Sequence, residues 1–165
     1  MLNLIASIIV STNLGYVTAY DDVRLQPAWV QYALESNEVV LARRHNFPFS
    51  ADPRFPGSDA TADYSHSGYD RGHMAPAADF NWSMDALRET YYFSNICPQK
   101  PDMNRGPWRE IEMEVRNLAR SGTVNILTAP LGWTTNRCGR LPVPEKFVKV
   151  VWGEFGFRLY IEDNK

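Results

Sequence analysis

Cysteine and histidine are scarce in this sequence, which has two cysteines and three histidines among 165 residues. It contains no Cys-x-x-Cys pair and no two histidines at ligand spacing, so a structural zinc site is not expected. Cys97 and Cys138 leave two possibilities open, one disulfide bond or two free thiols.

A segment able to span a membrane is also missing. The apolar run over residues 2–10 is too short to cross a bilayer as a helix. It has no basic leader, since the first basic residue is Arg24, so it does not have the pattern of a signal peptide. We therefore expect an ordered first strand here rather than the remnant of an export segment, and we expect no membrane partner.

No large surplus of one charge is present, because 17 basic and 19 acidic residues give a net charge of −2. This balance argues against a wholly basic, histone-like binder. It is compatible with an enzyme of nucleic acids, since binding depends on the local patch of charge rather than on the sum. With 44% apolar and 22% charged residues the chain has the composition of a globular protein, and its length predicts one domain over 1–165.

The order of the elements predicts an α+β fold, because strands come first, two helices follow and strands return. The segment 44–68 reads as a long loop, of the length that is usually functional or mobile, and 93–106 reads as irregular. Ser36 and Asn37 suit a hairpin turn. Strands are predicted over 16–20, 28–34, 38–43, 123–129, 146–152 and 157–161, and helices over 84–91 and from about 107 to 122.

The stretch Tyr-Asp-Arg-Gly-His-Met-Ala-Pro, residues 69–76, concentrates chemically active side chains. Pro76 ends any strand that runs through it, so we expect a strand edge or tight loop that presents Arg71 beside His73. A fixed cation next to an imidazole, which titrates near neutral pH, suits chemistry on an anion such as phosphate. The simpler alternative is a buried histidine beside a surface salt bridge.

A second cluster lies downstream, where Asn104, Trp108 and Glu112 follow one another at intervals of four. On a helix these residues share one side, so Trp108 would pack toward the core while Asn104 and Glu112 frame a polar rim. An amide oxygen with water is a poor site for zinc but a reasonable one for magnesium. Alternatively, Asn104 is a helix cap and Glu112 an ordinary exposed helical residue.

Together these motifs resemble one enzyme family. Residues 69–76, the segment Asn-Ile-Cys-Pro-Gln at 95–99, and Asn104-x-x-x-Trp108-x-x-x-Glu112 occur in the order and with the internal spacing of the DNA/RNA non-specific endonucleases. These are the ββα-metal nucleases of the Serratia-nuclease and mitochondrial endonuclease G type. The resemblance extends from about Tyr16 onward and includes Phe147 to Lys149.

The resemblance implies a mainly antiparallel central sheet with a ββα-metal motif and a long helix that carries the metal ligand. It implies a nuclease that depends on magnesium, or on manganese in its place, and cuts DNA and RNA to 5′-phosphate products. His73 stands at the position of the general base, Asn104 at that of the direct metal ligand, and Glu112 at that of the acid that holds the metal through water. The remaining catalytic positions fall on Arg71, Asn95 and Arg43, with Arg44 as the substitute for Arg43.

Further basic residues could extend a track for the nucleic-acid backbone: Arg44, Arg54, Lys100, Arg105 and Arg109. His45 and His66 are weaker candidates for the base, because His45 follows a cation and His66 lies in a flexible polar run. A narrower phosphodiesterase and a catalytically silent nucleic-acid-binding protein stay open as alternatives, as do a homodimer and an inhibitor protein as partners. A secreted, periplasmic or organellar location is favoured over others, and a phage origin stays open.

Overall fold

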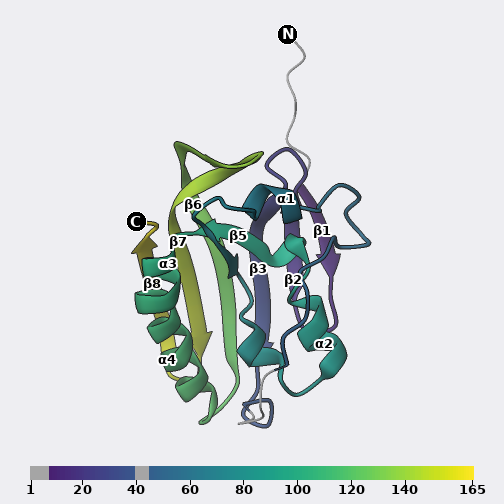
Figure 1. Ribbon diagram of the computed structural model, residues 1–165. Helices are drawn as coiled ribbons and strands as arrows, with labels where there is room; N and C mark the ends of the chain where they lie inside the picture. Colours follow the sequence, from purple (N-terminus) through teal and green to yellow (C-terminus); the bar gives the residue numbers. More distant parts are fainter. Residues whose placement is uncertain (1–7, 40–44) are drawn as a thin grey trace.

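The computed structural model describes residues 8–39 and 45–165, which are built around one large antiparallel sheet (Figure 1). Its strands follow the order β1-β2-β3-β6-β7-β8, and every neighbouring pair is antiparallel. This confirms the predicted α+β class with a mainly antiparallel sheet. The strands are β1 (Ile8–Thr12), β2 (Val17–Asp21), β3 (Gln26–Leu34), β6 (Val124–Cys138), β7 (Leu141–Gly153) and β8 (Gly156–Asp163).

A second, two-stranded sheet lies in front of the first and carries the 69–76 motif (Figure 1). It pairs β4 (Asp70–His73) with β5 (Ile96–Gln99), with Gly72 opposite Cys97. A Cβ at position 72 would come within 2.1 Å of the Gln99 side chain, so a larger residue there would have to displace this buried side chain. The helical pieces before β5 are α1 (Thr61–Tyr64), η1 (Ala77–Phe80), α2 (Met84–Glu89) and η2 (Phe93–Asn95).

After β5 the chain continues directly into a kinked helical run. It consists of α3 (Pro101–Met103), a π-helical turn η3 (Asn104–Trp108) and α4 (Arg109–Ala119), and Gly106 departs from helical dihedral angles in η3. The order β4, β5, helix is the predicted ββα arrangement. Asn104 lies in the η3 turn that precedes α4, however, and not in the long helix itself. Such π-helical turns often occur at functional sites.

The core lies between the large sheet and the helical run. Trp108 is buried as expected, and together with Ile111 and Val115 it joins a cluster that includes Phe147 and Val151 of β7. Figure 1 shows α4 over the β7–β8 side of the sheet and α2 toward the β1–β2 side, with β4 and β5 between them. The two helices and the small sheet thus cover the same face.

Two predictions for the first half of the chain differ from the structure where it is described. A strand over 38–43 does not form at its start, because the backbone N–H of Glu38 donates to the Glu35 carbonyl (3.0 Å) and closes a turn; residues 40–43 lie outside the described residues. The segment 44–68 is not loop throughout, because it contains helix α1. Its described part is anchored to Arg140, which donates hydrogen bonds to Asp63 at 2.7 and 2.8 Å.

The second half contains more regular structure than predicted. The segment 93–106 is not irregular, since it forms β5 and the start of the helical run. β6 and β7 extend well beyond 123–129 and 146–152 into a long hairpin, and prolines at 142 and 144 concealed this extension in the sequence. Among the described residues, no helix is both long and apolar enough to cross a membrane.

Candidate active site

One cavity of about 680 Å³ brings the two motifs together. Its wall comes from β4, from the η3 turn and from α4, segments that lie some thirty residues apart in the chain. Six predicted site residues line it: Arg71, His73, Asn104, Arg105, Arg109 and Glu112. The expected polar rim of Asn104 and Glu112 therefore exists, and it faces the same space as the histidine.

His73 is held at the end of β4 by the pairing of that strand with β5, in which it lies opposite Ile96. Its ring packs against Phe49 (centroids 5.4 Å apart) and edge-on against Tyr91 (5.1 Å). These contacts fix the plane of the imidazole, while the residue stays partly exposed and lines the cavity. The ring can therefore meet a ligand in one orientation.

Asn95 does not line the cavity, and its side chain is fully buried. The amide Nδ2 donates to the carbonyls of Ala75 (2.9 Å) and Thr90 (2.8 Å), and Oδ1 accepts from the Ala75 N–H (2.9 Å). These hydrogen bonds fix the backbone at Ala75, two residues after His73. The geometry therefore gives Asn95 a positioning role, without direct contact to a ligand.

Asn104 is oriented by a residue of the first motif. Its Nδ2 donates to Asp70 Oδ2 (2.9 Å), and Arg105 donates to both oxygens of the same carboxylate (2.8 and 2.6 Å). Partial burial raises the pKa of Asp70, but the hydrogen bonds from Arg105 and Asn104 outweigh it and leave the pKa below its usual 3.8. Asp70 thus stays charged and leaves the Oδ1 end of the Asn104 amide for other ligands. Asp70 stands in the first motif, but sequence reasoning assigned it no role.

Charged residues that the sequence did not single out lie behind Glu112. Arg116 lines the cavity and pairs with buried Asp79 (2.7 Å), which also accepts from the Tyr32 hydroxyl (2.6 Å). Lys149 of β7 is buried beneath them and donates to Thr128 Oγ1 (2.9 Å). Buried and less buried residues alternate along β7, and extending this alternation through residue 149 could have revealed that Lys149 is buried.

Arg71 is held between aromatic rings, with its guanidinium carbon 5.5 Å from the centroid of Phe49 and 5.4 Å from that of Tyr64. Such stacking orients the guanidinium group.

Cys97 and Cys138 are both buried and free, so the choice between a disulfide bond and two free thiols is decided in favour of thiols.

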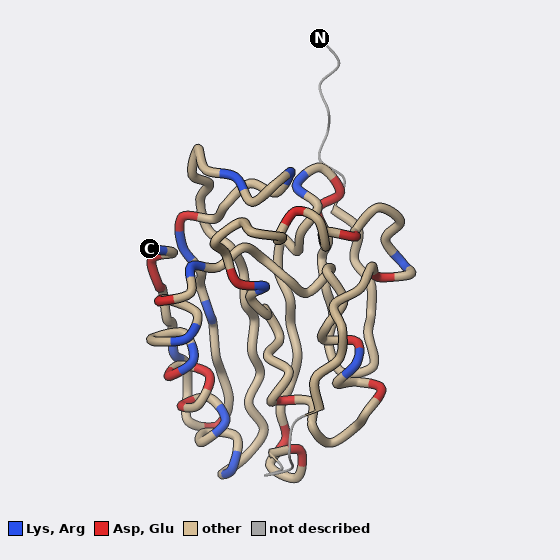
Figure 2. The backbone as a smooth tube through the Cα atoms, viewed as in Figure 1, with Lys and Arg blue, Asp and Glu red and all other residues tan. Residues whose placement is uncertain are grey.

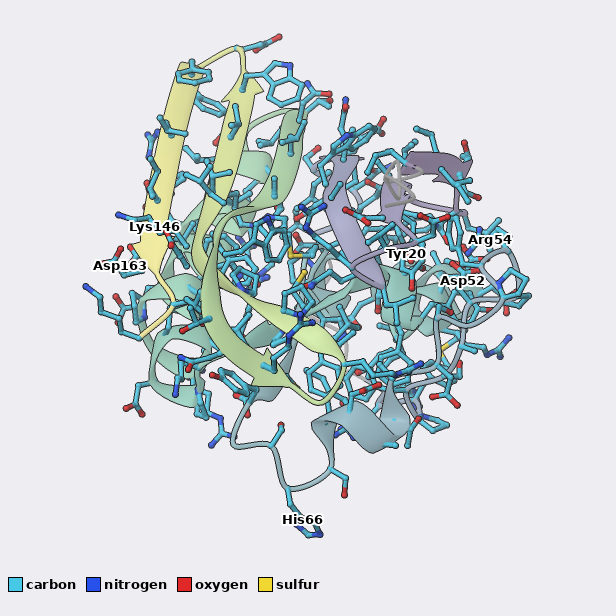
Figure 3. All side chains as sticks on the ribbon, turned by 90° about the horizontal axis from the view of Figure 1, so that it is seen from above. Tyr20, Asp52, Arg54, His66, Lys146 and Asp163 are labelled. Carbon is cyan, nitrogen blue, oxygen red and sulfur yellow. The ribbon has the colours of Figure 1, made fainter. Side chains whose placement is uncertain are left out.

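Several predicted basic residues lie elsewhere. Figure 3 shows Arg54 beside Asp52, and the two form an ion pair at 2.8 Å, so Arg54 serves the loop and does not line the cavity. Lys100 lies over the ring of Tyr69 (4.8 Å), outside the cavity wall. Arg43 and Arg44 lie outside the described residues.

The other histidines are remote from this cavity. His66 is exposed at a loop tip and points away from the protein body (Figure 3). His45 is also exposed and does not line the cavity. His73 is thus the histidine that meets the second motif.

The donor set at this cavity fits a hard divalent cation. Asn104 contributes an amide oxygen and Glu112 a carboxylate, and magnesium and manganese favour oxygen donors. In the part of the chain that the structure describes, no group of three or more His, Cys, Asp and Glu side chains could hold a metal. An ion here would keep much of its water, as magnesium does and structural zinc does not.

Charge around the cavity is mixed rather than uniformly basic. Figure 2 shows Lys and Arg interspersed with Asp and Glu along α4. Arg105 and Arg109 supply cations at the mouth, while Asp70 and Glu112 supply anions. A polyanion would therefore meet local cations within an acidic protein.

Comparison with known proteins agrees with this geometry. Residues 5–160 match the model of the DNA/RNA non-specific endonuclease family. The chain is 38% identical over 127 residues to "Nuclease EXOG, mitochondrial" of Xenopus laevis, covering 74% of this chain and 36% of that protein. It is 38% identical over 125 residues to "Nuclease 1, mitochondrial" of Schizosaccharomyces pombe, covering 72% and 39%.

A solved structure shows the same fold. It is described as "Crystal structure of the EndoG/EndoGI complex: Mechanism of EndoG inhibition", and it superimposes with a TM-score of 0.83 at 29% identity. The match covers 94% of this chain and 74% of that one. The chain nevertheless spans only a little more than a third of the length of the mitochondrial nucleases named above.

Proposed function

Because the chain belongs to the DNA/RNA non-specific endonuclease family, we propose that it hydrolyses phosphodiester bonds of DNA and RNA at the cavity described above. The observation that carries the proposal is the meeting of His73, Asn104 and Glu112 in one cavity. The three come from two distant motifs, and a structural role alone would not require them to face the same space. The domain that performs this chemistry is taken as 1–165.

In this proposal His73 is the general base. Neutral imidazole takes a proton from the attacking water near neutral pH, and such help is typically worth ~10²–10⁴ in rate. The stacking against Phe49 and Tyr91 aims the ring at one point of the cavity. Asn95 supports the ring indirectly, because it fixes the backbone at Ala75.

Asn104, through Oδ1, and Glu112, through water, would hold a divalent cation, with magnesium favoured and manganese as a substitute. When bound, this ion supplies Lewis-acid stabilisation of the charge that develops on the phosphate and on the leaving oxygen. Asp70 keeps the Asn104 amide turned so that its oxygen is the exposed donor. A neutral amide ligand also leaves more of the ion's charge for the substrate.

Arg71 and Arg109 complete the binding surface by contacting phosphate oxygens, for which the fork of a guanidinium is well suited. None of the groups in the cavity wall needs to read a base edge, so cleavage should follow the backbone rather than the sequence. Products with 5′-phosphates, an organellar location and control by an inhibitor protein are carried over from the family and its named relatives.

A digestion experiment tests the proposal. Circular plasmid and RNA are incubated with the purified chain in magnesium and in EDTA, and the same assays are run with His73→Ala. We expect cleavage of both substrates in magnesium only, and a loss of ~10²–10⁴ in His73→Ala. His66→Ala is the matched control, because this histidine lies at an exposed loop tip, and it should cut like the unmodified chain. Equal cutting in EDTA, or an active His73→Ala, contradicts the proposal.

A further inference from the structure

Lys149 is buried at a position where a strand ordinarily carries an apolar residue. It is 1% exposed, and its neighbours on the same face of β7, Phe147 and Val151, are completely buried. A buried ammonium is costly unless hydrogen bonds and opposite charges compensate it. Its one hydrogen bond among the described residues goes to Thr128 Oγ1 (2.9 Å), although the group has three donors. The remaining compensation must come from charge.

The charged groups that act on Lys149 are Glu112, Asp79 and Arg116. Burial lowers the pKa of Lys149, and the two carboxylates oppose this effect. Asp79 also forms the ion pair with Arg116 at 2.7 Å. Among the charged groups, Glu112 acts most strongly on Lys149.

The aromatic contact places Lys149 directly beneath the predicted metal-binding segment. Its Nζ lies 4.9 Å from the ring centroid of Trp108. Trp108 is itself buried, and it stands midway between Asn104 and Glu112, four residues from each. Lys149 thus contacts Trp108 in the middle of this segment and interacts electrostatically with Glu112 at its end.

We propose that Lys149 is a positioning residue for the divalent-cation site, whose buried charge holds the Glu112 carboxylate against the cavity wall. The inference rests on the proposed function only in that Asn104 and Glu112 bind the ion. It assigns a role to a residue of the sheet that touches neither the ion nor the substrate. The same ammonium, by packing on Trp108, also fixes the turn that carries Asn104.

A purely structural role makes a different prediction. An apolar side chain of similar volume costs little at a buried position when it leaves no charged partner uncompensated. If Lys149 merely fills space, Lys149→Met should fold well and bind metal normally. If Lys149 positions Glu112, Lys149→Met should lose stability, because it leaves carboxylates without their counter-charge, and it should bind metal poorly.

The test measures metal binding without substrate, by the electron paramagnetic resonance signal of free Mn²⁺ titrated with the whole chain. Loss of a residue that orients a metal ligand typically weakens metal affinity 10–100-fold. We expect Lys149→Met to raise the Mn²⁺ dissociation constant about tenfold while the variant stays folded, as its circular dichroism spectrum checks. Lys146→Met is the matched control, since Lys146 lies on the same strand but is exposed and pairs with Asp163 at the surface (Figure 3). It should leave the constant unchanged.

A second variant and a double mutant complete the test. Lys149→Gln removes the charge while keeping a donor for Thr128, and it replaces Lys149→Met if that variant fails to fold. In a Glu112→Gln background, Lys149→Met should change Mn²⁺ affinity clearly less than it does in the unmodified chain, because the part of its effect that passes through Glu112 is then absent. A folded Lys149 variant that binds Mn²⁺ normally overturns the inference and leaves the proposed function intact. An unmodified chain that binds no Mn²⁺ overturns the metal site itself.

Discussion

Replacing Asn95 by alanine should unfold the protein far more easily, although this residue touches no ligand. The variant removes three hydrogen bonds of 2.8–2.9 Å. It leaves the N–H and carbonyl of Ala75 and the carbonyl of Thr90 buried without these hydrogen-bond partners. At about 1 kcal/mol for each bond, the loss is roughly 3 kcal/mol. Domains of this size are typically stable by about 5–15 kcal/mol, so this is a substantial fraction of the total.

Urea denaturation followed by tryptophan fluorescence measures this loss. We expect the midpoint to fall with an unchanged slope, and the thermal midpoint to drop by roughly 6–12 °C, since about 1 kcal/mol corresponds to 2–4 °C at this size. Asn95→Asp is the informative companion, because it keeps the shape and the acceptor but directs a carboxylate oxygen at two carbonyls. It should be at least as unstable as Asn95→Ala. A destabilisation below about 0.5 kcal/mol in Asn95→Ala would show that these bonds are not what fixes the chain after His73.

Two further changes test other contacts of the site and its supporting loop. Asp70→Ala removes the acceptor that orients Asn104, so Mn²⁺ affinity should fall 10–100-fold while thermal stability changes little; unaltered affinity contradicts the orienting role. Hydrogen bonds from Arg140 are the largest effect on the Asp63 carboxyl and hold its pKa below 3.8. The Asp63–Arg140 pair therefore stabilises the folded state at pH values above 3.8. This stabilisation is lost as the pH falls through the folded-state pKa of Asp63. The stability difference between the unmodified chain and Asp63→Asn, measured in urea, should therefore be constant near neutral pH and shrink below about pH 4. A difference that does not depend on pH contradicts this.

Spacing in the sequence predicted that Asn104 and Glu112 share one side, and the resemblance to the nuclease family implied that His73 belongs to the same site. Asn104 and Glu112 are eight residues apart, a spacing that places both on one side of a helix. Trp108 between them marks the edge of that side that faces the core. His73 follows from the first motif, whose proline and glycine limit it to a short strand or turn. The structure places all of these residues as expected, although a π-helical turn replaces regular helix at Asn104.

The supporting contacts could not be predicted in this way, because they depend on partners distant in the sequence. In the pairing of β4 with β5 the Gln99 side chain lies close over Gly72, and four-residue strands carry no period strong enough to reveal this pairing in the sequence. Asn95 reads as a polar residue near a site until its three backbone partners are seen. Lys149 reads as an ordinary surface lysine unless the alternation of β7 is extended through it.

The hydrogen bond between Asp70 and Asn104 spans 34 positions of the chain and joins the two motifs into one unit. Exchange of one motif must therefore preserve this contact. A chimera that takes residues 69–76 from one relative and 95–112 from another should retain its activity only if the donor pair keeps a carboxylate opposite an amide. Substitutions at positions 70 and 104 should accordingly be inherited together, so that the two sites diverge as a pair rather than independently.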